Sequence, residues 1–162
     1  MQSGNFYFIK DDFYEKFFDE KDLKPNKDDD CEKHGRPCYY AFKESDSEIM
    51  WMVPISSQVE KYEKIYNEQI KKYNPYDGIK FGYVLGRKTA FLIQNMCPVI
   101  PRYVKNEYID NATNKPVVIK DVLASNINAS VRKAVRLYRR GTKIVFPDIL
   151  KMESILLEEL KK

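Results

Sequence analysis

Two serines and a lysine follow the apolar segment IMWMV at residues 49–53. Ser56 and Ser57 carry hydroxyl groups, and Lys61 lies four residues after Ser57, which is about one helical turn. The first amides of a helix have no intrahelical partner, so hydroxyl and ammonium groups at a helix start suit a phosphate. The three side chains therefore predict a site that stabilises negative charge on a reacting phosphate group.

The same segment also has an ordinary structural explanation. Ser57 and Glu60 have the S-x-x-E spacing of a capping box, in which each side chain accepts a hydrogen bond from a backbone amide at the helix start. Under this alternative Ser57 does no more than begin a helix. The two explanations are compatible, because a capped helix start gathers the amides that a phosphate binds.

A second candidate lies in the segment HGRPC at residues 34–38. His34 is the single histidine of the chain, and histidine is the side chain whose ordinary pKa lies near neutrality. Arg36 offers a planar group that suits a phosphate or stacks on a base. An exposed loop histidine without a function is the alternative for His34.

Metal binding is not expected. Cys31, His34, Cys38 and Cys97 could be drawn as a zinc site, but their spacing fits no standard zinc finger or ribbon. The sequence contains no paired carboxylates and no phosphate-binding glycine loop, so we also expect no cofactor.

Charge is unevenly distributed along the chain. Residues 11–32 hold ten acidic residues against four lysines, whereas residues 122–147 contain no acidic residue. A basic helix without carboxylates favours a polyanionic partner, although a solvated helix face balanced by other elements is the alternative. The cations of this region are Arg132, Lys133, Arg136, Arg139, Arg140 and Lys143.

Apolar periodicity and turn residues predict an alternation of strands and helices. The expected helices cover residues 57–73, 121–140 and 149–160, with a short helix or turn at 11–18. The expected strands cover residues 5–9, 36–42, 48–55, 97–101, 102–109 and 116–119, with two more within 81–95 that turn at 85–88. This order predicts an α+β fold with a compact antiparallel, barrel-like sheet and inserted and C-terminal helices.

Residues 1–162 are long enough for one domain with its own core. The sequence shows no signal peptide and no apolar run that could span a membrane. Three cysteines without framework spacing are typical of reduced thiols, so we expect a cytoplasmic protein.

Several segments resemble the endoribonuclease toxins of type III toxin–antitoxin systems, the ToxN, AbiQ and CptN family, with the CptN branch closest. The resemblance extends from about residue 5 to residue 160. The segments are FYFIKDDFYEKF, HGRPCYYAF, WMVPISSQVEKYEKIY, FGYVLGRKTAFLIQNMCP and VRKAVRLYRRGTKIVFPDILKMESILLEEL.

This resemblance implies a sheet related to the Kid and MazF toxins and a metal-independent ribonuclease. Such an enzyme cuts cellular or phage RNA at a specific sequence, and it leaves a 2′,3′-cyclic phosphate and a 5′-hydroxyl. The resemblance also implies inhibition by a small repeated RNA antitoxin that folds as a pseudoknot. The toxin cuts this RNA into units, and toxin and RNA close into a ring-like assembly.

Site residues carry over from the family one by one. The hydroxyl pair matches Ser56 and Ser57, and a basic position matches Arg36. The N-terminal aromatic position matches the pair Phe13 and Tyr14, of which only Tyr14 could act through a hydroxyl. The catalytic lysine follows the second hydroxyl almost at once in the ToxN branch, but here three residues intervene, so Lys61 is the match and Lys64 the alternative. The expected catalytic residues are Ser56, Ser57, Lys61, His34 and Tyr14. The expected RNA-binding residues are Arg36, Lys64, Arg87, Lys88, Arg132, Lys133, Arg136, Arg139, Arg140 and Lys143.

Two other functions remain open. A type II endoribonuclease of the MazF or Kid kind would have a protein antitoxin in place of an RNA. A non-catalytic RNA-binding module would use the serines only as a helix cap.

Overall fold

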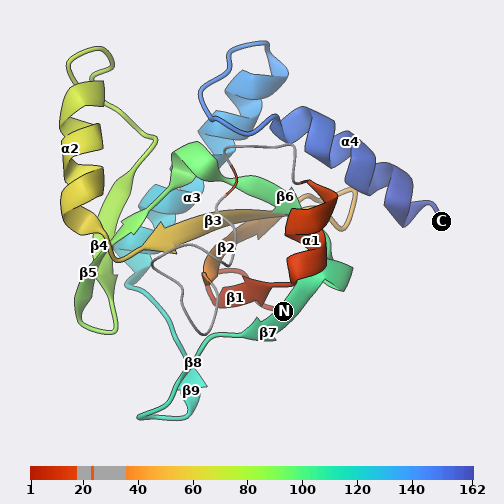
Figure 1. The fold of residues 1–162 in the computed structure, drawn as a ribbon, viewed down its shortest axis with the longest axis horizontal. Coiled ribbons are helices and arrows are strands. Elements are labelled where there is room, and N and C mark those ends of the chain that lie inside the picture. The colour runs from red at the N-terminus through yellow and green to blue at the C-terminus, as the bar shows by residue number, and fades with distance from the viewer. Residues whose placement is uncertain (18–22, 24–35) are drawn as a thin grey trace.

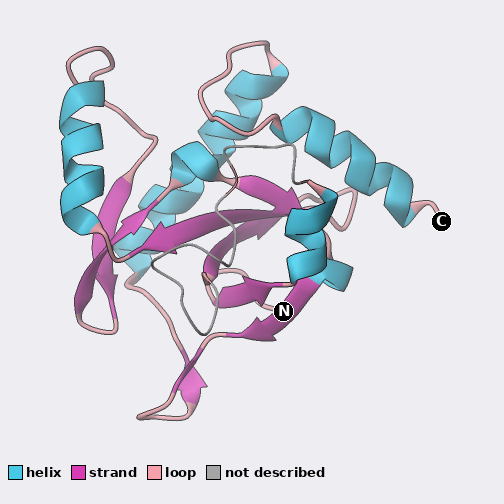
Figure 2. Ribbon diagram, viewed as in Figure 1, coloured by secondary structure: helices cyan, strands magenta, loops and turns pink. Residues whose placement is uncertain are grey.

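The computed structural model describes residues 1–17, 23 and 36–162. The elements form one main antiparallel sheet with helices on both faces, and a short hairpin projects from it (Figures 1 and 2). The strands are β1 (Phe6–Ile9), β2 (Cys38–Lys43), β3 (Met50–Ser56), β4 (Lys80–Val84), β5 (Arg87–Phe91), β6 (Cys97–Val99), β7 (Val104–Glu107), β8 (Ile109–Asp110) and β9 (Lys115–Pro116). The helices are α1 (Asp11–Lys16), α2 (Val59–Gln69), α3 (Asp121–Arg139) and α4 (Ile149–Leu160), with short 3-10 turns η1 (Ile93–Asn95) and η2 (Pro101–Tyr103).

The central strand of the sheet is β3. Its partner on one side is β2, followed by β1 and β7. On its other side β6 pairs with Met50–Met52, and β5 pairs with Ile55 and Ser56 before β4 completes the sheet. The α+β class and the antiparallel sheet are therefore confirmed. Within the described residues the sheet stays open, because β4 and β7 end it without pairing to each other.

Pro54 lies in this central strand, where proline is rarely found because it cannot donate a ladder hydrogen bond. It falls between the residues that pair with β6 and those that pair with β5. Its carbonyl oxygen accepts a hydrogen bond from the Leu92 amide at 2.9 Å. Pro54 therefore marks the point where β3 changes partner.

Residues that pair directly across an antiparallel ladder point to the same face. Ser56, Ala90 and Phe81 form such a row, and the Phe81 ring packs on Tyr66 of α2. The face that carries Ser56 is therefore the face that α2 covers.

The opposite face is covered by α3. Tyr39 of β2 donates its hydroxyl hydrogen to Asn128 of α3, and a methyl group at Gly82 of β4 would overlap Leu123 of the same helix. Glycine at residue 82 thus allows the close approach of sheet and helix.

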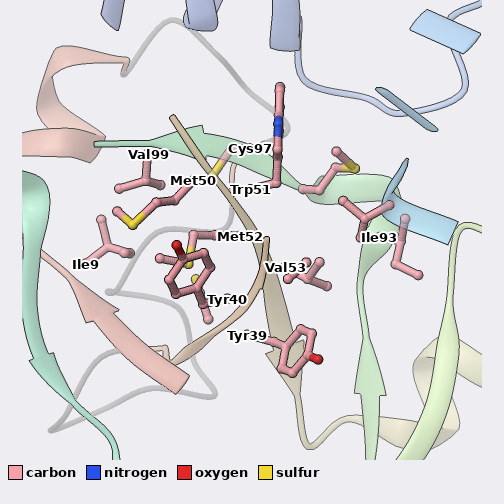
Figure 3. Close-up of a cluster of buried hydrophobic side chains, with 14 of the residues drawn as sticks. Ile9, Tyr39, Tyr40, Met50, Trp51, Met52, Val53, Ile93, Cys97 and Val99 are labelled. Carbon is pink, nitrogen blue, oxygen red and sulfur yellow. The ribbon is translucent and has the colours of Figure 1, made fainter. Parts of the chain in front are cut away.

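Most of the core lies around β3. Figure 3 shows Met52 and Tyr40 on one side of this strand and Val53 and Tyr39 on the other. Trp51 is fully buried and donates from its indole nitrogen to Glu44 at 2.8 Å. A second, smaller cluster lies between α2 and the β4–β5 hairpin, and its buried members are Tyr62, Ile79, Ala90 and Leu92.

The predicted elements agree with the structure in most places. The hairpin turns where expected, through Leu85 and Gly86, which both have positive φ as a two-residue type I′ turn requires. The strand expected at residues 116–119 is wrong, because strand structure ends there with Pro116. No helix among the described residues has the length and apolarity needed to cross a bilayer.

Candidate active site

Ser56, Arg36 and Tyr14 come together beside the end of β3. Cys38 of β2 pairs with Pro54, so the antiparallel register brings Arg36 beside the last residues of β3. Tyr14 lies on α1, and its hydroxyl interacts with the Cys38 thiol. Helix α1, the segment before β2 and the end of β3 therefore supply one group of polar residues, Tyr14, Arg36 and Ser56, which we call the corner.

The two serines have different environments. Ser56 is 3% exposed, and its Oγ accepts a hydrogen bond from the Gln58 amide at 3.1 Å. Ser57 is exposed, and its carbonyl oxygen accepts from the Val59 amide at 2.8 Å. Because α2 begins at Val59, the serine hydroxyl that accepts a hydrogen bond from the residue before this helix belongs to Ser56 and not to Ser57.

The predicted capping box is therefore wrong. The N-cap residue of α2 is Gln58, whose side chain makes no cap hydrogen bond. The strand continues through Ser56 because this residue pairs with Ala90 of β5. The pairing delays the helix start by one residue relative to the S-x-x-E pattern, so Ser57 and Glu60 cannot act as Ncap and N3.

Lys61 and Lys64 are both exposed on α2. Lys61 lies in the first helical turn, and its ammonium group is 5.3 Å from the centre of the Tyr62 ring. Both lysines are thus on the helix that starts at the candidate corner, and Lys61 is nearer to that start.

Arg36 is fully buried, in contrast to the accessible arginine that the sequence predicts. Its Nη1 donates a hydrogen bond to the carbonyl oxygen of Ile55 at 2.8 Å. Arginine keeps its charge even when buried, because its pKa lies far above neutrality. The residue therefore places a permanent positive charge beneath the corner and does not present an open face for a base to stack on.

Tyr14 has a partly exposed side chain with a buried hydroxyl end. Burial raises the pKa of this hydroxyl well above its ordinary value of 10.0, the Cys38 and Cys97 thiols raise it further, and Arg36 opposes the shift. The hydroxyl consequently stays protonated at neutral pH, so it can donate a hydrogen bond or a proton but cannot serve as a base in its resting state.

His34 lies outside the described residues, as does Cys31. Cys38 and Cys97 are buried thiols, and burial raises the pKa of Cys97 well above its ordinary value. In residues 1–17, 23 and 36–162 no three metal-binding side chains are grouped together.

The basic stretch of α3 occupies the sheet face opposite to Ser56, and part of it is already engaged. Arg139 forms ion pairs with Glu44 at 3.0 Å and Glu153 at 2.8 Å. Lys133 binds Asp77 at 2.9 Å, and the guanidinium of Arg132 lies 3.9 Å from the centre of the Phe42 ring. These three cations therefore have structural contacts.

The remaining cations of the stretch, Arg136, Arg140 and Lys143, are exposed. On the β4–β5 hairpin Arg87 is also exposed, while Lys88 pairs with Glu63 of α2 at 2.7 Å, and this hydrogen bond raises the pKa of Lys88. The candidates for RNA contact thus divide into engaged and accessible side chains.

Sequence patterns did not identify the groups that complete the corner. These are the Gln58 amide, the Ile55 carbonyl oxygen and the thiols of Cys38 and Cys97. Backbone groups carry no sequence signal of their own. β2 and β3 are buried on both faces, so their burial shows no alternation that could have placed Cys38 on the face of Ser56, and only the pairing register does so.

Neither the family models nor the curated proteins include a match to this chain. Several solved structures share its fold, including the following two. One is AbiQ, a lactococcal anti-phage endoribonuclease belonging to the type-III toxin–antitoxin system, with a TM-score of 0.71 and 13% sequence identity over 99% of this chain and 100% of the other. The second belongs to a bacterial antiviral system that a processed non-coding RNA regulates, with a TM-score of 0.65 and 12% identity over 93% of this chain and 95% of the other.

Proposed function

We propose that this protein is a metal-independent endoribonuclease toxin of a type III toxin–antitoxin system, related to the ToxN, AbiQ and CptN family and closest to CptN. The observation that carries the proposal is the corner of Ser56, Arg36 and Tyr14 at the end of β3, in a fold that matches AbiQ along 99% of the chain. The similar structure from an RNA-regulated antiviral system supports the same conclusion.

The reaction that we propose is the one that the family resemblance implies, and the groups at the corner suit it. The 2′-oxygen of the RNA attacks the adjacent phosphorus and loses its proton, the bond from phosphorus to the 5′-oxygen breaks, and that oxygen gains a proton. The products are a 2′,3′-cyclic phosphate and a 5′-hydroxyl. The enzyme must orient the 2′-oxygen in line, move the two protons and stabilise the added negative charge.

Each residue has a role that suits its environment. Ser56, Ser57 and the amides that follow Val59 in the first turn of α2 donate hydrogen bonds to the phosphate oxygens, and Arg36 and Lys61 supply positive charge. Tyr14 is held protonated and donates to the leaving 5′-oxygen. His34 is the candidate for accepting the proton of the 2′-hydroxyl.

The regulator that we propose is a small repeated RNA that folds as a pseudoknot and is cut into units by the toxin. The accessible cation Arg136 lies on α3, which covers the sheet face opposite to Ser56. RNA bound to α3 would therefore lie on the other side of the sheet from the RNA that is cut at Ser56. A ring-like assembly of alternating toxin and RNA requires two such separate contacts. We place this complex in the cytoplasm.

The decisive experiment is to incubate the purified protein with RNA in EDTA and to map the ends of the products. Cyclic phosphate and 5′-hydroxyl ends are expected. Intact RNA that nevertheless binds would instead support a non-catalytic RNA-binding module. A type II system would be supported if a small reading frame, rather than tandem repeats, accompanied the gene and its product inhibited cleavage.

A further inference from the structure

We propose that Tyr73 is a stacking platform for an unpaired RNA base, at the far end of α2 from the candidate active site. This inference takes RNA as the ligand from the proposed function, but it does not depend on cleavage. It assigns a base-binding subsite to a surface that the catalytic residues do not include.

The Tyr73 ring is presented to solvent and supported from behind. Its side chain is 60% exposed, although tyrosine is a large and mostly apolar residue. The ring centre lies 6.4 Å from that of Tyr76, and their planes differ by 33°, the smallest angle of any ring pair in the described part of the chain. The Tyr76 ring thus contacts one side of the Tyr73 ring at a tilt, and the exposed side of Tyr73 can accept one more planar group, such as a base.

The supporting ring of Tyr76 is firmly held. Its hydroxyl donates to Gln94 at 2.6 Å, and burial raises the pKa of Tyr76 to about 12. A methyl group at Gly78 would overlap the hydroxyl end of this ring, so glycine at residue 78 allows the ring to approach the backbone there. A platform that is already fixed loses little conformational entropy when a base stacks on it.

Further rings connect the platform to the sheet. The Tyr76 ring contacts Tyr66 of α2 at 6.4 Å between centres, and Tyr66 contacts Phe81 at 5.9 Å. Phe81 pairs with Ala90, which pairs with Ser56. The rings thus lead from the face of Ser56 to Tyr73, and α2 separates the two positions by about 16 Å at a rise of about 1.5 Å per residue.

Lysines outnumber acidic residues in the segments next to the platform, although Lys71 pairs with Glu68 at 3.4 Å. Asp77 binds two lysines, Lys80 at 3.2 Å and Lys133 at 2.9 Å. Burial opposes the ionisation of Asp77, but the hydrogen bonds from Lys133 and Lys80 outweigh it and lower its pKa, so one carboxylate faces two ammonium groups. Lys71 and Lys72 immediately precede Tyr73 and are exposed. An exposed ring bordered by a surplus of cations fits single-stranded RNA.

Tyr83 provides a matched control. Its side chain is 65% exposed, and it lies on β4, yet no ring contact within the described residues involves it. If exposure alone determined RNA binding, replacing Tyr73 or Tyr83 would weaken binding equally. The proposal predicts that only the replacement of Tyr73 weakens it.

The test uses a fluorescent 2′-O-methyl RNA, which binds as a single strand but lacks the hydroxyl needed for cleavage. Tyr73→Ala is expected to weaken its binding about tenfold or more, because that is the usual effect of losing one stacked base. Tyr73→Trp should bind within about twofold of the wild type, as should Tyr83→Ala. Photocross-linking with a strand that contains 5-iodouridine should join the RNA to Tyr73 in the wild-type protein.

The proposal is overturned if Tyr73→Ala binds the single strand as the wild type does, or if Tyr83→Ala loses as much affinity. It is also overturned if the wild type associates with itself without RNA and Tyr73→Ala does not, since the ring would then belong to a protein interface. A wild type that binds through Tyr73 but never cuts RNA would refute the proposed function alone. A wild type that cuts RNA while Tyr73→Ala binds normally would refute this inference alone.

Discussion

Nη1 of Arg36 donates a hydrogen bond to the carbonyl oxygen of Ile55, the residue immediately before Ser56, across 2.8 Å. The bond joins the chain just before β2 to the end of β3. It fixes a positive charge at the backbone of the residue before Ser56, in a buried part of the molecule. A charge in such surroundings acts on a reacting phosphate more strongly than the same charge in water.

Arg36→Lys should therefore keep the positive charge but lose the planar hydrogen-bonding group of arginine. Lysine cannot reproduce the planar group that donates in several directions, so we expect cleavage to fall about 100-fold, which corresponds to about 3 kcal/mol of transition-state stabilisation. Single-turnover cleavage and thermal unfolding should be measured together. Cleavage by Arg36→Lys at the wild-type rate would remove Arg36 from the site.

Ser56→Ala and Ser57→Ala should differ in their effect on stability. Removing the Ser56 hydroxyl leaves the Gln58 amide without its acceptor and should cost about 1 kcal/mol in the free energy of unfolding. Ser57 is exposed, so its replacement should change stability by less than about 0.5 kcal/mol. Both variants should cut RNA more slowly, and urea unfolding separates the two effects. Equal destabilisation by both changes would contradict the assignment of Ser56 as the residue that holds the start of α2.

Tyr14→Phe should lower cleavage by a nearly constant factor at every pH below 10. The pKa of the Tyr14 hydroxyl lies well above its ordinary value of 10.0, so the group does not titrate in that range and contributes no limb to the pH profile. A loss of about 100-fold is typical for a positioned proton donor. If Tyr14→Phe instead removed an ionisation from the profile near neutral pH, the hydroxyl would be acting as a base.

Glu159→Gln should destabilise the protein near neutral pH and have a smaller effect in acid. Burial opposes the ionisation of Glu159, but hydrogen bonds from Tyr103 and Lys16 outweigh it and hold its pKa below its ordinary value of 4.5. A carboxylate with a lowered folded-state pKa stabilises the fold above the unfolded value, and this contribution disappears as the pH falls through the folded value. We expect a loss of about 1–2 kcal/mol at neutral pH.

Urea unfolding near pH 7 and near pH 3 measures this difference, and Glu158→Gln is the control. Glu158 is largely exposed and pairs with Lys161 at 3.1 Å, so its replacement should have little effect at either pH. An effect of Glu159→Gln that is the same at both pH values would show that charge is not its cause.

Arg136→Ala and Arg139→Ala should separate RNA binding from folding on α3. Arg136 is exposed, so its loss should weaken RNA binding. The slope of log affinity against log salt concentration should fall by the amount that about one phosphate contact contributes. Arg139 neutralises Glu44 and Glu153, so its loss should mainly reduce stability, by about 0.5–1 kcal/mol for this partly exposed pair of contacts. Binding titrations at several salt concentrations and thermal unfolding of both variants make the comparison. Equal salt slopes for Arg136→Ala and the wild type would exclude Arg136 from the RNA interface.

Local patterns were sufficient for most of the elements. The periodicity of residues 149–160 predicts α4 without error, and the Leu85–Gly86 turn follows from the sequence around it. The start of α2 was not predictable in this way, because it depends on a pairing of Ser56 with Ala90, more than thirty residues away in the chain. The S-x-x-E pattern fits a helix that begins one residue too early, and only the sheet decides between the two starts.

The same limit applies to the site. Residue types indicated Ser56 and Arg36, and the family resemblance indicated Tyr14. Neither could predict that Arg36 is buried or that α3 lies on the opposite face from Ser56. Periodicity identifies which side of a helix is apolar, but not which face of the sheet that side covers. The placement of basic residues relative to the corner therefore required the three-dimensional register.

The small core of Tyr62, Ile79, Ala90 and Leu92 beneath α2 is distinct from the main one, and the two meet where β3 changes partner at Pro54. Parts of a protein with few buried contacts open locally at a lower free energy than the whole molecule unfolds. We therefore expect the amides of α2 to exchange with solvent before those of β2 and the first half of β3. Ser56 lies at the end of β3, between the β2–β3 part of the sheet and the start of α2. RNA that contacts both would make the local opening of α2 depend on whether the site is occupied.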